Sequence, residues 1–385
     1  MARLRVPVGI LISSDGPYSV VSKSMLCGAL LGIAEAQAEH RDLEIEPIIA
    51  NPRGDNALYS TMAAEMLANG IRHVVGCYTS SSRKEIIPLF EKADALLWYP
   101  SHYEGFESSS NVVYTGAVAN QHLLPLVEYL LAHVGPKAFC VGSNYIWAWE
   151  NNRILREAIG PNGGTVVAER YFPVGCTEFG QAIDAILAAR PSFVFNTLIG
   201  ESSYQFLRDL RVACGRRGIK QAREIPVASC TLSEPELTAI GPGAVDGHIT
   251  SSVYFSSLDT PENERFVKAY HAQFPEGPVA SADAEATYLA ARLLALAVAE
   301  AGTDEACAVK RAVALRAIMA PQGEVRIDAE TMHAWLTPRI ACSRPDGSFT
   351  ILREARRPVQ ADPYLIRNSS RFGAVAIRPV LRVAS

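Results

Sequence analysis

Apolar runs that end abruptly in polar clusters are the feature that most constrains this chain. Residues 6–12 lead directly into Ser13-Ser14-Asp15-Gly16, and residues 73–77 lead into Tyr78-Thr79-Ser80. The same transition follows residues 96–98, 139–142, 193–195 and 227–228. Continuous apolar runs separated by helical patterns are typical of buried parallel strands. Ligands of open parallel sheets bind beyond the carboxyl ends of the strands, so these clusters lie where a small polar ligand would be held.

The order of the segments predicts an α/β chain. Strands are expected near 6–12, 44–50, 73–77 and 95–99, with helices over 19–39, 55–69 and 83–93. A second series has strands near 137–142, 165–171, 192–196, 225–229 and 246–252, with helices over 121–133, 147–159, 178–189, 202–214 and 234–240. The remainder has helices over 261–273, 281–301 and 305–319, then strands near 323–327, 337–343 and 348–353 with an Asp346-Gly347 turn. Such alternation requires right-handed crossovers, so we predict two Rossmann-like lobes with parallel sheets.

Composition excludes several classes of function. The 385 residues suffice for two or three domains, and a net charge of −4 argues against nucleic acid or an anionic membrane as a partner. No apolar run approaches the roughly 20 residues that span a bilayer. The eight cysteines include no C-x-x-C pair, so neither a metal nor a cofactor is expected.

The N-terminal segment indicates in which cellular compartment the protein is expected. Arg3 and Arg5 precede an apolar run as in a signal peptide, but Ser13 interrupts that run early and no cleavage pattern follows. We therefore interpret residues 6–12 as the first strand. A cytoplasmic protein is expected, or a periplasmic one if a leader peptide has been removed.

Two groups of residues at predicted strand ends are candidates for ligand contact. Around Ser80, backbone N–H groups at a helix N-terminus point into the crevice beside serine hydroxyls, although one serine could simply cap the helix. Aromatic side chains that follow strands form rigid pocket walls with a polar end, or alternatively cap the core of each lobe; they are Tyr99, Tyr103, Tyr145, Trp147 and Trp149.

No catalytic arrangement is found in the sequence, so no enzyme is predicted. Residues 200–204 do not match a nucleophile elbow, and no G-x-G-x-x-G follows the first strand. His73, His102, His122 and His133 lack metal spacing and are interpreted as surface or loop histidines. Asp283 and Glu285 are two positions apart on a helix and so cannot face one site together, although Asp283 alone could face a cleft.

Residues 74–84 and 93–107 closely resemble the amide-sensing negative regulators of bacterial aliphatic amidase operons. The resemblance continues in order through residues 142–146, 228–234, 254–261, 284–288, 320–323 and 361–364. Those regulators have the type I periplasmic-binding-protein fold and are related to urea and branched-chain amino acid receptors of ABC transporters. The resemblance implies one lobe from 1–118 with 253–328 and another from 121–250 with 331–385. The hinges are expected near 113–120, 250–256 and 324–335.

The resemblance also implies a ligand and its contacts. A small aliphatic amide would lie between the lobes against Ser80, Tyr99 and Tyr145, with Tyr78, Thr231 and Gly200 at neighbouring positions. Three residues depart from the family pattern: Ser101 replaces a threonine, Trp147 a tyrosine and Asp283 a tryptophan. A carboxylate at position 283 favours a ligand with extra N–H donors or positive charge, such as urea, a guanidine or an amino-amide.

Two functions of different classes remain open from the sequence. The leading prediction is a cytoplasmic amide sensor that regulates an RNA-binding antiterminator by protein contact, as the resemblance implies. The alternative is the substrate-binding subunit of an ABC importer for amides, urea or amino acids. A homo-oligomer is a further expectation, and an amidase is disfavoured because the sequence offers no nucleophile–base pair.

Overall fold

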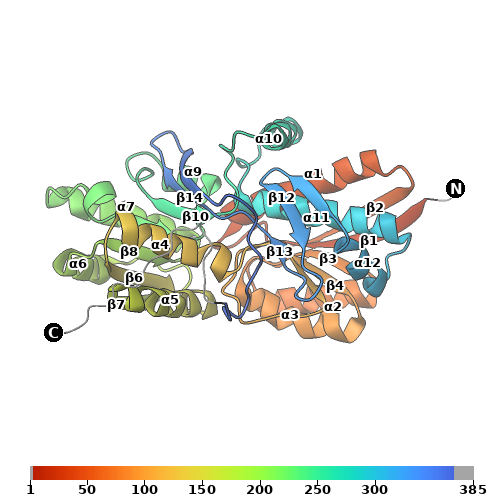
Figure 1. Cartoon of the computed structure of the whole chain (residues 1–385), viewed down its shortest axis with the longest axis horizontal. Helices are drawn as coiled ribbons and strands as arrows, with labels where there is room; N and C mark the ends of the chain where they lie inside the picture. Colours follow the sequence, from red (N-terminus) through yellow and green to blue (C-terminus); the bar gives the residue numbers. More distant parts are fainter. Residues whose placement is uncertain (1–2, 368–385) are drawn as a thin grey trace, which may run out of the picture.

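A computed structural model describes residues 3–367 and shows two lobes side by side along the long axis of the molecule (Figure 1). The first lobe contains a parallel five-stranded sheet in the order β2-β1-β3-β4-β5. Its strands are β1 (Leu4–Leu11), β2 (Leu43–Ala50), β3 (His73–Gly76), β4 (Leu96–Tyr99) and β5 (Val112–Tyr114). The first four of these strands match predicted ones, because their continuous apolar runs are buried.

The helices of the first lobe come from both ends of the chain. They are α1 (Ser19–Glu39), α2 (Asn56–Ala68), α3 (Ser80–Ala93), α10 (Pro261–Gln273), α11 (Ala282–Ala301) and α12 (Ala306–Val313). Helices α1 and α11 lie in close contact, since a Cβ atom on Gly28 would approach the Ala284 carbonyl oxygen to 2.1 Å. This backbone approach joins two segments that are far apart in sequence into one apolar core.

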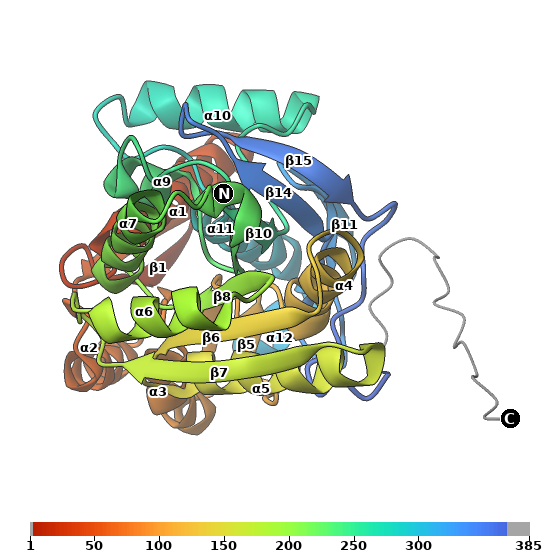
Figure 2. The ribbon, with the colours of Figure 1, turned by 90° about the vertical axis from the view of Figure 1, so that its left-hand side faces the viewer.

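The second lobe contains a seven-stranded sheet in the order β15-β14-β10-β9-β8-β6-β7 (Figure 2). Its strands are β6 (Lys137–Ser143), β7 (Thr165–Phe172), β8 (Phe193–Thr197), β9 (Val227–Ser229), β10 (Ile249–Ser252), β14 (Arg339–Ser343) and β15 (Phe349–Glu354). The helices are α4 (Leu123–His133), α5 (Ile146–Ile159), α6 (Gly180–Ala189), α7 (Glu201–Arg216), α8 (Gln221–Glu224) and α9 (Glu234–Ile240), with short 3₁₀ turns at Ala119–Gln121 and Gly160–Asn162. The β14–β15 pair is an antiparallel hairpin that turns at Gly347, where φ is 80°.

A small antiparallel sheet replaces the end of one predicted helix. The helix expected over 305–319 ends at Val313 as α12, and β11 (Ala317–Ala320) follows it. The prediction was wrong there because pairing of β11 with β12 (Gly323–Ile327) outweighs the helix propensity of an alanine-rich segment. The third strand of this sheet is β13 (Ala334–Trp335).

Up to the end of β15, the chain passes between the two sheets three times. The first two passages lie between β5 and α4 and between β10 and α10. The third was expected near 324–335, but β12 and β13 occupy that range and pack in the first-lobe core, so the passage falls between Trp335 and Arg339.

The segment after β15 was expected in the second lobe, within 331–385. Its described part returns to the first lobe, because Phe106 N donates a 2.7 Å hydrogen bond to the Pro363 carbonyl oxygen. Leu336 and Val359 also form an isolated antiparallel bridge. Residues 368–385 of the expected lobe lie outside the described residues.

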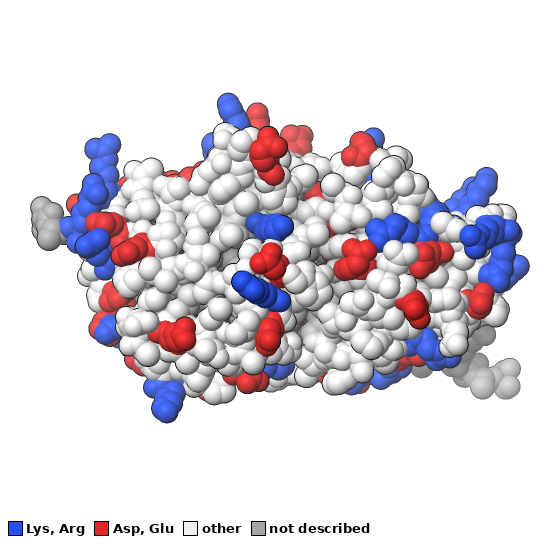
Figure 3. Space-filling model, turned by 180° about the vertical axis from the view of Figure 1, so that it is seen from behind, with Lys and Arg blue, Asp and Glu red and all other residues white. Residues whose placement is uncertain are grey.

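Helix α1 is long and apolar enough to cross a membrane, the one such helix among residues 3–367. More than half of its most apolar window is buried, and it follows β1, an interior strand of the first-lobe sheet, so it is a core helix of this fold. On the molecular face in Figure 3, acidic and basic side chains are interspersed rather than gathered by sign.

Candidate functional site

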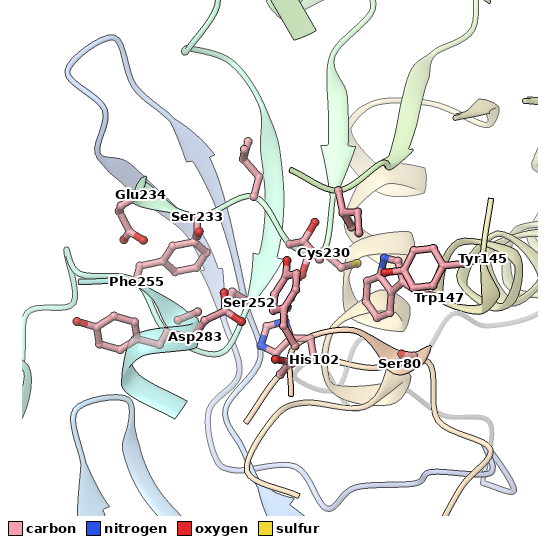
Figure 4. Close-up of a pocket in the computed structure, with 17 residues that line it drawn as sticks. Ser80, His102, Tyr145, Trp147, Cys230, Ser233, Glu234, Ser252, Phe255 and Asp283 are labelled. Atoms are coloured by element: carbon pink, nitrogen blue, oxygen red, sulfur yellow. Dashed lines mark hydrogen bonds between the residues drawn. The ribbon is translucent and has the colours of Figure 1, made fainter. Parts of the chain in front are cut away.

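A cavity lies between the lobes, where loops from the carboxyl ends of several strands converge (Figure 4). The first lobe lines it through the segments after β3 and β4 and through the first turn of α11. The second lobe contributes the segments after β6, β8 and β9, and residues 252–255 add the wall between the lobes. The cavity volume is about 20 Å³, which is room for about one water molecule, so the lobes leave little free space between them.

Seven of the nine residues expected at the ligand site line this cavity. They are Tyr78, Ser80, Ser101, Tyr145, Trp147, Thr231 and Asp283. Tyr99 and Gly200 are not among the lining residues. The polar residues that follow predicted strands therefore indicate where the cavity lies, but they do not show which of these side chains face it.

Ser80 opens α3, which begins three residues earlier than predicted because Thr79 caps the helix. Thr79 Oγ1 accepts a 3.2 Å hydrogen bond from Ser82 N, so Ser80 is not needed as the cap. Ser80 Oγ instead donates to Glu104 Oε2 at 2.5 Å and accepts from Arg83 Nη1 at 3.3 Å. Its proton is committed to Glu104, so toward a ligand Ser80 acts as an acceptor.

Arg83 is a fully buried cation close to the cavity floor. It pairs with Glu107 at 2.8 Å and with Glu104 at 3.3 Å. Its guanidinium also lies over the rings of Tyr99 and Tyr103, 4.6 and 4.4 Å from their centroids. These partners compensate the buried charge, so Arg83 serves the architecture of the first lobe.

Tyr99 was predicted to touch the ligand, and the structure places it behind the cavity instead. Its side chain is fully buried, and its hydroxyl donates to the Tyr78 carbonyl oxygen at 3.0 Å. Tyr99 is the last residue of β4 and packs in the core, whereas Ser101 lies beyond the end of the strand and reaches the cavity. Tyr99 therefore positions the backbone of a lining residue.

Gly200 was also expected at the pocket and lies at a contact between the lobes. It caps α7 with φ 59°, a conformation that favours glycine. A Cβ atom there would approach the Pro17 carbonyl oxygen to 1.8 Å. The requirement for glycine comes from this approach rather than from a ligand.

Two aromatic residues form the second-lobe wall of the cavity. Tyr145 is the extended residue before α5, and Trp147 lies in its first turn. Trp147 is only 3% exposed, and its indole Nε1 has no hydrogen-bond partner within the described chain. Trp149, in contrast, is 46% exposed and bonds Asn144, so it is neither a pocket wall nor a core residue.

Three carboxyl groups surround the other side of the cavity. Asp283 lies in the first turn of α11, which Ser281 caps, and Glu234 begins α9. Glu236 forms a capping box with Ser233 behind them. Burial raises the pKa of Asp283 to about 7 and that of Glu236 to about 8, and it also raises the pKa of Glu234.

His102 and Glu234 are lining residues that the sequence analysis missed. His102 was interpreted as a surface or loop histidine, but its Nδ1 lies 3.2 Å from the Cys230 carbonyl oxygen across the lobes. Nδ1 therefore carries the proton and Nε2 is an acceptor; burial lowers the pKa of the ring, which keeps it neutral. Its place three residues beyond β4 was the available signal, as was the place of Glu234 soon after β9.

The sequence of residues 6–370 matches the family described as periplasmic binding protein domain. The chain belongs to this family. Its lobes and interlobe cavity are those of a binding protein, and no cluster of metal-ligating side chains occurs within residues 3–367.

Similar solved structures share the fold of this binding protein. A solute-binding protein of an ABC transporter from Rhodopseudomonas palustris HaA2, in complex with p-hydroxybenzoic acid, has a TM-score of 0.83 at 20% identity, covering 95% of this chain and 100% of that one. A branched-chain amino acid transporter substrate-binding protein from Streptococcus pneumoniae, in complex with isoleucine, has a TM-score of 0.80 at 16% identity, covering 91% and 99%.

A curated protein from Geobacillus stearothermophilus named limonene hydroxylase is also similar in part. It is 26% identical over 119 residues, which are 31% of this chain. The match spans 22% of that protein's length, so the name describes the relative and carries no activity over to this binding protein.

Proposed function

We propose that this chain is the substrate-binding component of an ABC importer and closes its lobes around a small polar solute. The observation that carries the proposal is the small cavity bounded by both lobes and lined by hydroxyl, carboxyl and indole groups. A ligand that contacts both lobes binds the closed form better, and that difference in affinity drives closure. The structural neighbours, whose names are those of ABC transporter substrate-binding proteins, support this role.

A second candidate is the amide sensor that acts on an RNA-binding antiterminator. It is favoured by the four lining residues that the resemblance carries over, which are Tyr78, Ser80, Tyr145 and Thr231. Both candidates bind an amide-like, urea-like or related solute without converting it, so purified protein should release no ammonia from acetamide or urea. They differ in compartment, because an importer component works outside the cytoplasmic membrane and the sensor works inside.

Two experiments test these proposals. A thermal-shift screen of amides, urea, amino acids, benzoates and small amines should find solutes that raise the melting temperature, because ligand binding to the folded state stabilises it. No stabilisation by any of these classes would contradict the binding role. Fractionation of cells that express the full-length gene then separates the candidates: an extracytoplasmic product supports the importer, and a cytoplasmic one the sensor.

A further inference from the structure

Acidic side chains from both lobes meet at the cavity. Asp283 comes from α11 of the first lobe and Glu234 from α9 of the second, and both line the space between them. Glu236 lies close enough that its charge and that of Asp283 disfavour each other. The described lining residues include no lysine or arginine. Lobe closure therefore brings like charges together in a dry space, where repulsion is strong.

The neighbouring charged and titratable groups do not compensate this acidity. Arg83 forms ion pairs with Glu104 and Glu107, and Lys84 also pairs with Glu107. His102 is neutral. Its Nδ1 bonds the Cys230 carbonyl oxygen, so its other ring nitrogen, Nε2, is a hydrogen-bond acceptor. The remaining titratable neighbours of Asp283 are the hydroxyls of Tyr78 and Tyr204, which stay neutral because burial raises their pKa. Hydrogen-bond acceptors thus dominate this side of the cavity.

Asp283 is the carboxylate with the fewest partners. Glu234 accepts from Ser256 N and Oγ at 2.7 and 2.9 Å, whereas within residues 3–367 no other side chain donates to the Asp283 carboxylate. Asp283 is half-buried, and an ionised carboxylate that is partly removed from water without a partner is unfavourable. A bound cation with N–H donors would supply both the charge and the hydrogen bonds.

Trp147 adds an independent requirement from the opposite wall. Its indole is 3% exposed, and its N–H group, which donates only, has no acceptor. An unpaired buried donor costs free energy that a carbonyl oxygen on the ligand would recover. Trp147 and Tyr145 pack in the same cluster beside the cavity, so this acceptor end would lie on their side (Figure 4).

We propose that the ligand is a small organic cation with N–H donors at one end, held by Asp283 and Glu234, and a carbonyl acceptor at the other, held by Trp147. A short amino-amide has this chemistry, and the lobes must separate slightly to admit it, because the cavity of about 20 Å³ holds about one water molecule. The inference rests on the proposed binding function and names its ligand class. In this arrangement the cation bridges carboxylates of opposite lobes and so favours the closed form.

Calorimetry with glycinamide, propionamide and glycine tests the proposal. Glycinamide and propionamide match in size and differ by an ammonium in place of a methyl group, while glycine replaces the amide by a carboxylate. At pH 7 we expect glycinamide to bind about tenfold or more tightly than either of the others, as a charged hydrogen bond predicts. From pH 5.5 to pH 7 its affinity should rise as the carboxyl groups ionise, while that of propionamide stays constant.

Asp283→Asn and Asp259→Asn form a matched pair of variants. Both remove one negative charge, but Asp259 is exposed and lies outside the cavity lining. Asp283→Asn should abolish the preference for glycinamide over propionamide, and Asp259→Asn should keep it. If Asp283→Asn does not fold, the wild-type pH profile decides.

The outcomes separate this inference from the proposed function. Propionamide or glycine binding as tightly as glycinamide overturns the cation inference and leaves a solute receptor. An unchanged preference in folded Asp283→Asn also overturns it, since the cation would then bind elsewhere. If none of the three binds, the cation inference fails, and the thermal-shift screen alone decides the binding function.

Discussion

Gly200 of the second lobe lies against the carbonyl oxygen of Pro17 in the first lobe. Glu201 N also donates a 3.4 Å hydrogen bond to this oxygen, so the N-terminus of α7 meets the loop after β1. The contact joins the lobes at a point outside the cavity lining. It therefore stabilises the closed arrangement without touching the ligand.

Gly200→Ala should weaken ligand binding through closure alone. The added methyl group would occupy space 1.8 Å from the Pro17 oxygen at a positive φ, so the lobes must separate. We expect affinity for the best ligand of the thermal-shift screen to fall about tenfold or more, because the closed form of the protein that binds this ligand becomes less populated. Titration calorimetry measures the change, and small-angle scattering should show a more open liganded protein. Affinity equal to that of Gly180→Ala, where a Cβ atom meets no neighbour, would contradict the role of this contact.

Tyr145→Phe should lower ligand affinity, whereas Tyr99→Phe should lower the stability of the fold. Tyr145 lines the cavity, so loss of its hydroxyl should weaken ligand binding by roughly five- to 150-fold and leave the fold intact. Tyr99 bonds the Tyr78 backbone behind the cavity, so Tyr99→Phe should lower the free energy of unfolding by about 1 kcal/mol and change affinity little. Calorimetry and urea denaturation of both variants provide the comparison, and equal loss of affinity in the two would contradict it.

Ser80→Ala should cost stability as well as affinity. The change removes the donor to Glu104, a carboxylate that is 1% exposed, and such a loss costs about 1–3 kcal/mol. Ser81→Ala is the matched control, because Ser81 is only half-buried and its bond to Asn56 is 3.5 Å long. Denaturation midpoints of the two variants should differ clearly. Similar midpoints would show that Ser80 and Glu104 do not support each other.

The contribution of Glu236 to the stability of the free protein should fall as pH rises from about 5 to 8. Burial raises the pKa of Glu236 from 4.5 to about 8, so the folded state holds this proton more tightly than the unfolded state does. The share of the free energy of unfolding that Glu236 contributes therefore falls across this window, by on the order of 1 kcal/mol or more. Glu236→Gln keeps a hydrogen-bonding group and should remove this share, so the stability of wild type should fall relative to that of the variant as pH rises. Denaturation at pH 5, 6.5 and 8 tests this, with Asp259→Asn as control; equal slopes for wild type and Glu236→Gln would contradict it.

The sequence pattern predicts the α/β lobes and the strand-end location of the site, because buried parallel strands and their polar ends are local features. It does not separate Tyr99 from Ser101, since these neighbours at the same predicted strand end place their side chains in the core and in the cavity, respectively. It also misses His102, whose acceptor role depends on a carbonyl group in the other lobe. The helix predicted over 305–319 was wrong at its end for the same reason, because β11 forms through pairing with β12, which is not a local feature.

The contact between α1 and α11 also sets the order in which the protein is assembled during translation. Ser24 Oγ lies 2.8 Å from Ser281 Oγ, and these residues are 257 positions apart. At roughly 5–20 residues per second, α1 waits about 13–50 s on the ribosome before its partner emerges. During that interval the face of α1 that packs against α11 is uncovered, so we expect a chaperone to shield this apolar face of the nascent chain.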